Sequence, residues 1–339
     1  MTRRLAVPPE ILVPAVALLA VLIAFLCTPL ISGRALTTFD FYNTFQGLAQ
    51  LGLLTLGLGV TMIAGEFDLS VAGTYVLGGM LAVRTGQSSA ILGVAVAVAA
   101  GAAIGAAQGG LIARLRIPSL PVTLATYIAL LGLSSAMSGG LSVTFTNTAA
   151  TLWIDRRVAG LFTVPSLVTI AGFLITAAIF GGTRLGREIR AIGGDRRASR
   201  VAGVRVERGL VGLFTVSGML AALGGALFSY SYATANPNPG LQPLILATVG
   251  CLVGGVSLAG GRGLPVGLLA GALAVALLGQ IDAITAIPDY YTELLYAALL
   301  GVIVVVDAPG LRRGLDRLRA RTMSARGTDR PEPVQRRTP

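Results

Sequence analysis

Long apolar stretches alternate with short polar segments along almost the whole chain. Ten stretches are candidates for membrane helices: residues 11–31, 47–64, 71–84, 90–113, 118–138, 163–181, 209–230, 244–259, 264–281 and 292–307. Several are shorter than the roughly 20 helical residues that a hydrocarbon core of about 30 Å requires. The pattern predicts an all-α polytopic membrane protein with about ten transmembrane helices.

The arginine positions support this count. With the N-terminus inside, ten crossings place every basic residue on the inner side except Arg34, Arg84, Arg156 and Arg157. Such an excess of positive charge marks the cytoplasmic side, so we expect both termini in the cytoplasm. Merging 47–84 into one kinked span would put the arginine-rich segment 184–208 outside, and we therefore expect two spans there.

Composition excludes several classes of protein. Hydrophobic residues make up 54% of the chain and charged residues 12%, against about 25% charged residues in soluble domains. All 26 basic residues are Arg, and there is no His. Without Lys there is no phosphate-binding GK[ST] motif, and without His the commonest metal ligand and general base is missing. We expect no enzyme, no cofactor and no metal on this chain, and the net charge of +11 fits a cytoplasmic face rather than nucleic acid.

The two ends of the chain frame a membrane domain over residues 11–310. Residues 1–10 are expected to be cytoplasmic, and the first apolar stretch exceeds the 7–15 residues of a signal-peptide core. Cys27 and Cys251 both lie in apolar stretches, which argues against a disulfide framework, and Leu26 is unsuited to a lipoprotein cleavage site. The tail 311–339 is basic: 311–322 is expected to form an interfacial helix, and 323–339 to be disordered.

Glycines recur at a spacing of four in two places. They are Gly101, Gly105 and Gly109 in one stretch, and Gly263, Gly267 and Gly271 at the start of another. This spacing puts three glycines on one helix face, where a neighbouring backbone can approach closely. Tight packing alone explains the pattern. Alternatively, these stretches and the short interrupted segments 65–79 and 250–263 occupy matching places in an inverted repeat, which is typical of transporters with a pathway between two halves.

Two groups of polar residues are candidates for a pathway. Glu66, Asp68 and Ser70 lie in GEFDLS between two apolar stretches, and carboxylates at membrane depth are usually functional. The alternative is that Asp68 or Ser70 caps the helix that follows, at the membrane surface. Gln46 and Gln50 are four residues apart and share a helix face, where they are suited to bind a polyhydroxylated solute or another helix.

The segment 184–208 has more pattern than a simple basic loop. Apolar positions at helical spacing flank a Gly-Gly pair, and small residues leave room for close approach: Ile189, Ile192, Val201, Val204, Gly193, Gly194, Ala198, Ala202 and Gly203. We expect a short helix–turn–helix under the membrane that presents an interaction surface.

The same segment with the following helix, GREIRAIGGDRRASRVAGVRVERGLVGLFTVSGMLAALGGAL, resembles ribose-type ABC importer permeases. Two further stretches agree, AGEFDLSVAGTYVLGGMLAV at 64–83 and the segment 253–307, so that the resemblance covers about 45–307. It implies the membrane-spanning subunit of a sugar importer in the bacterial inner membrane. The implied partners are an ATPase subunit that carries ATP and Mg²⁺, an extracytoplasmic binding protein, and a second permease copy or paralogue.

The resemblance also implies which residues dock the ATPase: Gly186, Arg187, Ala191, Ile192, Gly193, Gly194, Asp195, Ala198, Ala202 and Gly203. Asp195 stands where the family often has Asn. At 241–244, LQPL replaces an acidic residue that many relatives carry, which leaves the solute open. We expect that replacing both Gly193 and Gly194 by Trp uncouples transport without preventing membrane insertion.

Three other functions stay open at this point. An ion-coupled secondary transporter would need buried carboxylates, for which Glu66 and Asp68 are the candidates. A branched-chain amino-acid permease of the same superfamily would differ in its solute. A membrane enzyme would need a nucleophile–base pair or a metal cluster, and the sequence offers neither.

Overall fold

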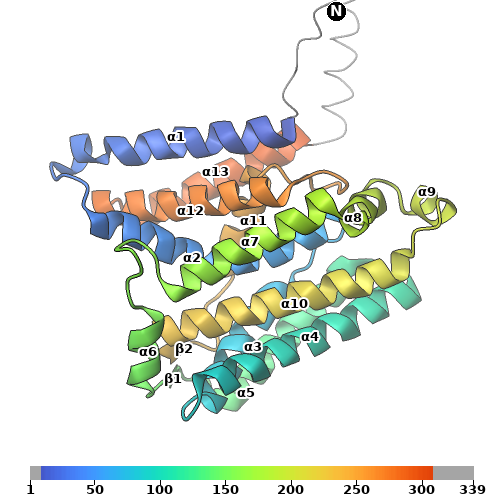
Figure 1. Ribbon diagram of the computed structural model, residues 1–339, viewed down its shortest axis with the longest axis horizontal. Helices are drawn as coiled ribbons and strands as arrows, with labels where there is room; N and C mark the ends of the chain where they lie inside the picture. The colour runs from blue at the N-terminus through green and yellow to red at the C-terminus, as the bar shows by residue number, and fades with distance from the viewer. Residues whose placement is uncertain (1–8, 308–339) are drawn as a thin grey trace, which may run out of the picture.

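The computed structural model describes residues 9–307 as a bundle of helices that run along the long axis of the molecule (Figure 1). The elements are α1 (Pro9–Ser32), α2 (Thr38–Ile63), α3 (Ser70–Thr85), α4 (Ala90–Leu115), α5 (Ser119–Ser138), β1 (Val143–Thr144), α6 (Thr148–Ile154), α7 (Val164–Gly182), α8 (Arg184–Gly194), α9 (Arg196–Val201), α10 (Val206–Ser231), β2 (Thr234–Ala235), α11 (Gln242–Val253), α12 (Pro265–Thr285) and α13 (Asp289–Asp307). The tail segments 311–322 and 323–339 lie outside the described residues.

A helix coincides with each of the ten predicted stretches. Seven of the described helices are long and apolar enough to cross a membrane, namely α1, α2, α4, α5, α7, α10 and α12. The helices α3 and α11 are shorter, with 16 and 12 residues. The prediction of an all-α, multi-pass membrane protein is confirmed.

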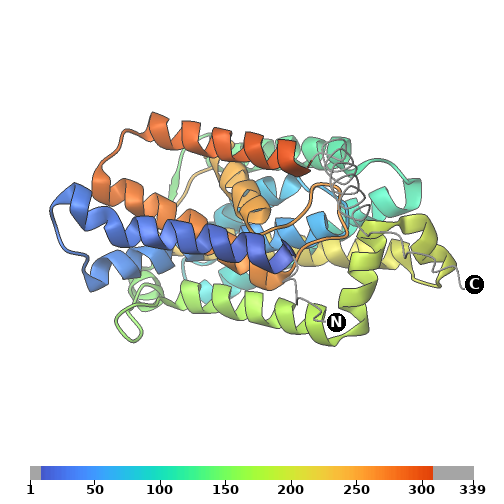
Figure 2. The same cartoon turned by 90° about the horizontal axis from the view of Figure 1, so that it is seen from above.

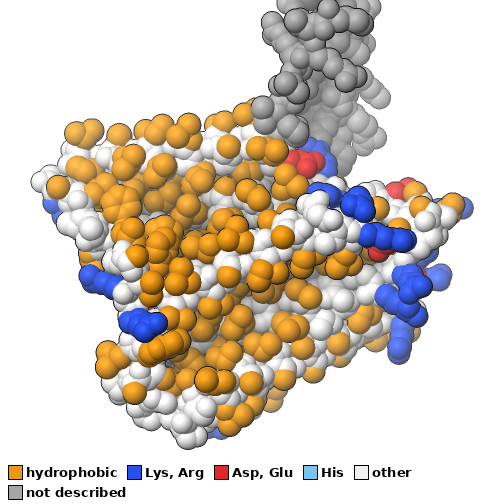
Figure 3. Space-filling model, viewed as in Figure 1, with side chains coloured by type: hydrophobic (Ala, Val, Ile, Leu, Met, Phe, Trp, Pro, Cys, Tyr) orange, Lys and Arg blue, Asp and Glu red, His pale blue; other side chains and the backbone are white. Residues whose placement is uncertain are grey.

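The surface is divided as a bilayer requires. Figure 3 shows hydrophobic side chains across the middle of the face in view, with Lys and Arg side chains, here all arginine, gathered towards its two ends. Helices α8 and α9 lie at one end, here called the inner end. The opposite, outer end carries α6 and the antiparallel pair β1–β2, in which Val143 faces Ala235. Figure 2 shows α13 and α7 on opposite sides of α1.

Helices α2 and α10 form the centre of the bundle. They contact each other, and α10 also packs on α3 and α4 while α2 packs on α11 and α12. Glycine permits the closest of these contacts, since a Cβ at Gly101 or Gly105 would overlap the carbonyl oxygens of Gly218 or Phe214. A Cβ at Gly109 would lie 2.9 Å from the Cβ of Phe214.

The second glycine series is only partly as expected. Gly267 and Gly271 belong to α12, where a Cβ would overlap the carbonyl oxygens of Gly254 and Gly250. Gly263 does not share this helix face, because α12 begins at Pro265 and Gly263 has a φ of +136° that a helix cannot contain. Its conformation serves the loop before α12 instead.

The ends of α2 and α11 have the same backbone geometry. In each, a glycine in the left-handed region, Gly65 at φ +79° or Gly255 at φ +78°, closes a Schellman motif. The hydrogen bonds run from Gly65 to Met62, from Glu66 to Thr61, from Gly255 to Leu252 and from Val256 to Cys251, at 2.9–3.1 Å. These motifs end both helices and lead into the loops 64–69 and 254–264.

Candidate functional site

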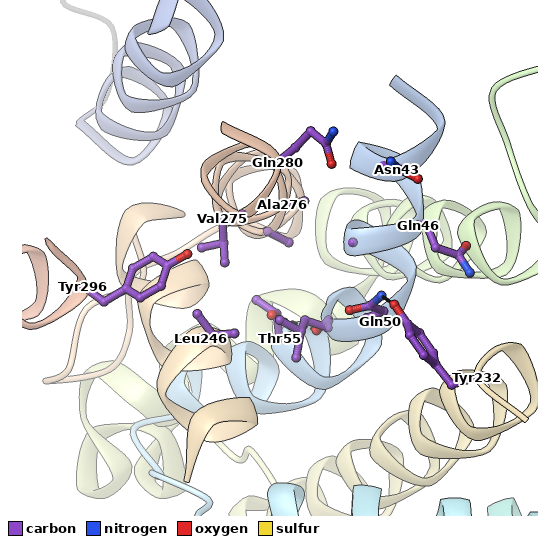
Figure 4. Close-up of a pocket in the computed structure, with 14 residues that line it drawn as sticks. Asn43, Gln46, Gln50, Thr55, Tyr232, Leu246, Val275, Ala276, Gln280 and Tyr296 are labelled. Carbon is purple, nitrogen blue, oxygen red and sulfur yellow. Dashed lines mark hydrogen bonds between the residues drawn. The ribbon is translucent and has the colours of Figure 1, made fainter. Parts of the chain in front are cut away.

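A cavity of about 330 Å³, lined by both polar and apolar residues, opens beside the outer part of α2. It is formed by α2, α11, α12 and α13, together with the end of α10 (Figure 4). Its lining residues are Asn43, Gln46, Gly47, Gln50, Leu51, Thr55, Tyr232, Leu246, Ala272, Val275, Ala276, Gly279, Gln280 and Tyr296. The volume is within the range of about 300–1,000 Å³ that is usual for small-molecule sites.

The chemistry of the lining is neutral. None of the 14 lining residues is charged, and the polar groups are amides and hydroxyls, with Asn43, Gln50, Gln280 and Tyr232 among them. Amides and hydroxyls both donate and accept hydrogen bonds. Such a surface suits an uncharged solute with many hydroxyl groups. A second cavity of about 230 Å³ shares Gln50, Leu51 and Leu246 with the first and continues towards α3.

The two glutamines predicted for a pathway both line this cavity and also bond to the protein. Gln50 donates to the hydroxyl of Tyr232. Gln46 donates to a carboxylate oxygen of Asp155 at 3.2 Å and accepts from the Thr163 hydroxyl at 2.9 Å. Burial raises the pKa of the Asp155 carboxyl, which lies in the outer loop after α6. These bonds show that both amides connect segments of the protein, and their use in binding a solute stays a prediction.

At the outer rim of the cavity, a carboxylate that was not among the predicted site residues connects α2 with α12. Asp40 forms a bidentate pair with Arg34 at 2.7 and 3.0 Å and accepts from Gln280 of α12 at 3.2 Å. The available signal was Thr37 three residues before Asp40, a capping-box spacing that the structure confirms at the start of α2. The other missed lining residues, such as Tyr232 and Tyr296, come from distant segments.

Towards the inner end the cavity is closed by packed side chains. Residues 55–63 of α2 are nearly all buried at or below 2% exposure or are glycines. The Cys251 thiol of α11 donates to the carbonyl oxygen of Thr55 at 3.3 Å, and Gly59 lies against Leu268 of α12. The structure thus has a cavity on the outer side and a dense plug on the inner side.

Glu66, Asp68 and Ser70 do not line either cavity. Asp68 is fully buried, and it accepts hydrogen bonds from the amide and hydroxyl of Ser70 at 3.0 and 2.6 Å. It also accepts from Ser217 of α10 at 3.3 Å and Gln108 of α4 at 3.5 Å. Asp68 therefore joins α3, α4 and α10 at the start of α3. The bond from the Ser70 amide agrees with the alternative in which Asp68 caps the following helix, but Asp68 is buried among helices and not at the surface. A role in the pathway stays a prediction.

Glu66 has a different partner. Its carboxylate, 5% exposed, lies 2.6 Å from the guanidinium of Arg196 on α9. The pair joins the α2–α3 loop to the inner segment 184–208.

The inner segment forms two short helices, as the pattern indicated. Thr183 caps α8, and Asp195 caps α9 by accepting from the amides of Arg197 and Ala198. The predicted docking residues divide into two sets. Gly186 and Ile192 are buried and Gly193 packs against the end of α2, while the exposed ones are Arg187, Ala191, Gly194, Asp195, Ala198, Ala202 and Gly203. Only the second set offers a surface to a partner.

This division corrects the expected effect of the double tryptophan variant. A Cβ at Gly193 would overlap the carbonyl oxygen of Ile63, so a large side chain there displaces α8 from α2. Gly194 has open space around it. The double variant would therefore disturb the fold as well as the docking surface.

Comparison with known proteins agrees with this architecture. The sequence model of the family described as "Branched-chain amino acid transport system / permease component" matches residues 43–304. The chain is 30% identical to the ribose import permease protein of Escherichia coli strain K12, over 86% of this chain and 92% of that protein. It is 30% identical to the L-arabinose ABC transporter permease protein of Azospirillum brasilense, over 80% and 83%. It is 26% identical to the xylose transport system permease protein of Escherichia coli strain K12, over 90% and 93%.

No solved structure matches the chain. The family match spans most of the sequence, and its relatives are transport permease components rather than enzymes. The chain belongs to the family of transport-system permease components whose relatives include the ribose, arabinose and xylose permeases.

Proposed function

We propose that this chain is the membrane-spanning subunit of an ABC importer in the bacterial inner membrane, and that its solute is a monosaccharide or a related polyol. The observation that carries the proposal is the uncharged, amide- and hydroxyl-lined cavity in a chain related to sugar permeases. The chain has no Lys and hence no phosphate-binding motif of its own. A separate ATPase would therefore supply the energy.

The cavity favours a sugar over the alternative solutes. An amino acid carries an ammonium and a carboxylate group, which a site usually matches with charged partners, and the lining has none. An ion-coupled transporter needs a carboxylate that is free to bind its ion. Glu66 and Asp68 are instead occupied by Arg196 and by a hydrogen-bond network.

The proposed topology has ten crossings with the inner end in the cytoplasm. Its support is the arginine distribution together with a helix at each predicted stretch. An inverted repeat of two five-helix halves is consistent with the packing, because α4 packs on α10 as α12 packs on α2. The short helices α3 and α11 then hold the third place in each half.

Three partners follow from this proposal. An ATPase subunit with ATP and Mg²⁺ would bind the exposed face of α8 and α9, and a second permease copy or paralogue would complete the transporter. A solute-binding protein would dock at the outer end.

The cavity can be narrowed without disturbing the fold. Gly279 lines it, and a Cβ there has nothing within 4 Å. We expect Gly279→Leu to lower uptake of labelled pentoses and hexoses by at least about tenfold, or about 1.4 kcal/mol of barrier, with normal yield of folded protein. Gly212→Leu, at an equally open glycine of α10 outside the cavity, is the control. Equal uptake by both variants would rule out this cavity as the pathway.

The docking surface is tested at Gly194, which is exposed and has open space around it. We expect Gly194→Trp to abolish co-purification of the ATPase and solute uptake while the protein still inserts and folds. Gly132→Trp, at an open glycine of α5, should leave co-purification intact. Retention of the ATPase by the Gly194 variant would show that α8 is not its docking site.

At the outer end, two arginines are stacked on aromatic rings. Arg157 lies 4.8 Å from the ring centre of Tyr42, and Arg156 lies 5.1 Å from that of Trp153. No ion pair involves either arginine among the described side chains, which do not include those of Asp289 and Asp307. The aromatic rings hold the two guanidinium groups in place. Their positive charges are therefore available to pair with carboxylates of a binding protein.

Charge reversal tests this surface. We expect Arg156→Glu with Arg157→Glu to weaken binding of the solute-binding protein by about tenfold or more at low salt, mainly through the association rate. The measurement is surface plasmon resonance on the permease in nanodiscs. Arg84→Glu, at an exposed arginine that lacks a ring contact among the described residues, should bind nearly as the wild type does. An equal loss in both variants would contradict a specific docking role.

A further inference from the structure

Three segments meet at the inner end through their backbones. The amide of Gly261, in the α11–α12 loop, donates to the carbonyl oxygen of Ile63 at 2.8 Å. Gly193, near the end of α8, packs on the same carbonyl, and a Cβ at Gly260 would lie 2.5 Å from the Cα of Gly65. Because glycines make these contacts, α8 lies directly against the end of α2 and the α11–α12 loop.

One charged contact reinforces this junction. The Glu66 carboxylate in the α2–α3 loop is 5% exposed, and the Arg196 guanidinium of α9 that pairs with it is 38% exposed. The other ion pairs of segment 184–208 among the side chains that the structure describes are Arg184–Glu188 and Arg200–Glu207. Neither of them reaches the α2–α3 loop. A buried carboxylate that loses the cation paired with it is strongly unfavourable, so this pair holds α9 and the α2–α3 loop together.

The junction adjoins the inner side of the plug, which residues 55–63 of α2 form with the side chains packed on them. Residues 55–63 of α2 lead from the cavity to Gly65, and the Cys251 thiol of α11 is packed on the Thr55 carbonyl. A displacement of the end of α2 therefore has to change the packing between α2 and α11. This is the part of the structure that must open for solute to leave the cavity on the inner side.

We propose that the Glu66–Arg196 ion pair is the positioning contact that transmits movement of α8 and α9 to the end of α2, and so couples an ATPase on the inner face to opening of the plug. The proposal rests on the proposed importer function. When the ATPase pulls on the α8–α9 surface, the ion pair and the glycine contacts carry the α2–α3 loop with it. Glu66 and Arg196 contact no solute in this mechanism.

A native thiol reports on the plug. The chain has two cysteines, so Cys27→Ser leaves Cys251, which is fully buried, as the only thiol. In the complex purified with its ATPase, we expect ATP with vanadate to change the rate of Cys251 modification by N-ethylmaleimide at least about fivefold, a modest value for coupled sites. In Arg196→Gln and Glu66→Gln we expect the ratio of the modification rates with and without ATP and vanadate to fall close to one. The ATPase should still be bound and still hydrolyse ATP.

Two further variants separate coupling from general damage. Because the two residues act as one contact, the double variant should lose no more than the worse single variant. Arg208→Gln, at an exposed arginine of the same segment, should respond to ATP as the wild type does. A wild-type response in Arg196→Gln, additive losses in the double variant, or no ATP response in the wild type would each overturn the proposal. Absence of any ATPase from the wild-type complex would instead refute the proposed function on which it rests.

Discussion

Replacing Gly105 by Leu is expected to prevent stable folding. A Cβ at this position would overlap the carbonyl oxygen of Phe214 and would lie 2.9 Å from the Cα of Thr215. The clash is with backbone, so α4 and α10 have to separate along their whole contact. Overpacking in a tight core costs about 3 kcal/mol, and here the packing of two central helices is lost. Thermal unfolding in detergent and the yield of monodisperse protein measure the effect.

Gly110 provides the matched control for this prediction. It lies in the same helix five residues further on, and a Cβ there has nothing within 4 Å. Gly110→Leu removes a flexible residue from a helix interior, which favours the helix by up to about 1 kcal/mol. Its melting temperature should therefore equal or exceed that of the wild type. Similar losses in both variants would mean that α4 and α10 are not packed as described.

Replacing Asp68 by Leu is expected to have the second largest effect. The change removes the acceptor for the amide and hydroxyl of Ser70 and for the hydroxyl of Ser217, which are buried. Gln108 loses its longer bond and keeps the one to the Ser70 hydroxyl. Leaving several such groups unpaired costs about 3 kcal/mol in total, at about 1–3 kcal/mol each. Helix α3 should then detach from α4 and α10, seen as a lower melting temperature and faster proteolysis of the α2–α3 loop.

Asp68→Asn distinguishes the network from the charge. The side-chain oxygen of the new Asn can still accept from Ser70. The Gln108 side-chain oxygen has no partner among the described residues, and it can accept from the new Asn amide if the Gln108 amide group flips. We expect a loss of about 1 kcal/mol or less. If the Asn variant is as unstable as the Leu variant, the carboxylate charge itself holds the three helices, and the hydrogen-bond account is wrong.

Much of the fold could be predicted because its signals are local in the sequence. Apolar length located the ten stretches, and the glycines at 101, 105 and 109 marked the face on which α4 packs. Gly65 and the polar residues after it marked the break between α2 and α3. The prediction that Gly263 shares a helix face with Gly267 was wrong because local spacing alone does not fix where a helix begins. Its spacing from Gly267 fits a helix, but Pro265 starts α12 after it.

The site depended on contacts that no local pattern contains. Gln46 and Gln50 were found because they share one helix face. Tyr232 at the end of α10, Gln280 of α12 and Tyr296 of α13 reach the same cavity from segments far away in the sequence. Glu66 was selected for its charge, but its partner Arg196 lies 130 residues away in the sequence. The burial of Ile192 and Gly186 likewise follows from packing that spacing cannot distinguish from a docking face.

Affinity purification of the tagged chain from native membranes in mild detergent, with mass spectrometry of the proteins that accompany it, tests the central claim most directly. The proposed function predicts a nucleotide-binding ATPase subunit and an extracytoplasmic solute-binding protein whose ligand is a sugar or polyol. Recovery of the chain alone, with solute uptake in proteoliposomes that needs an ion gradient and no ATP, would contradict it.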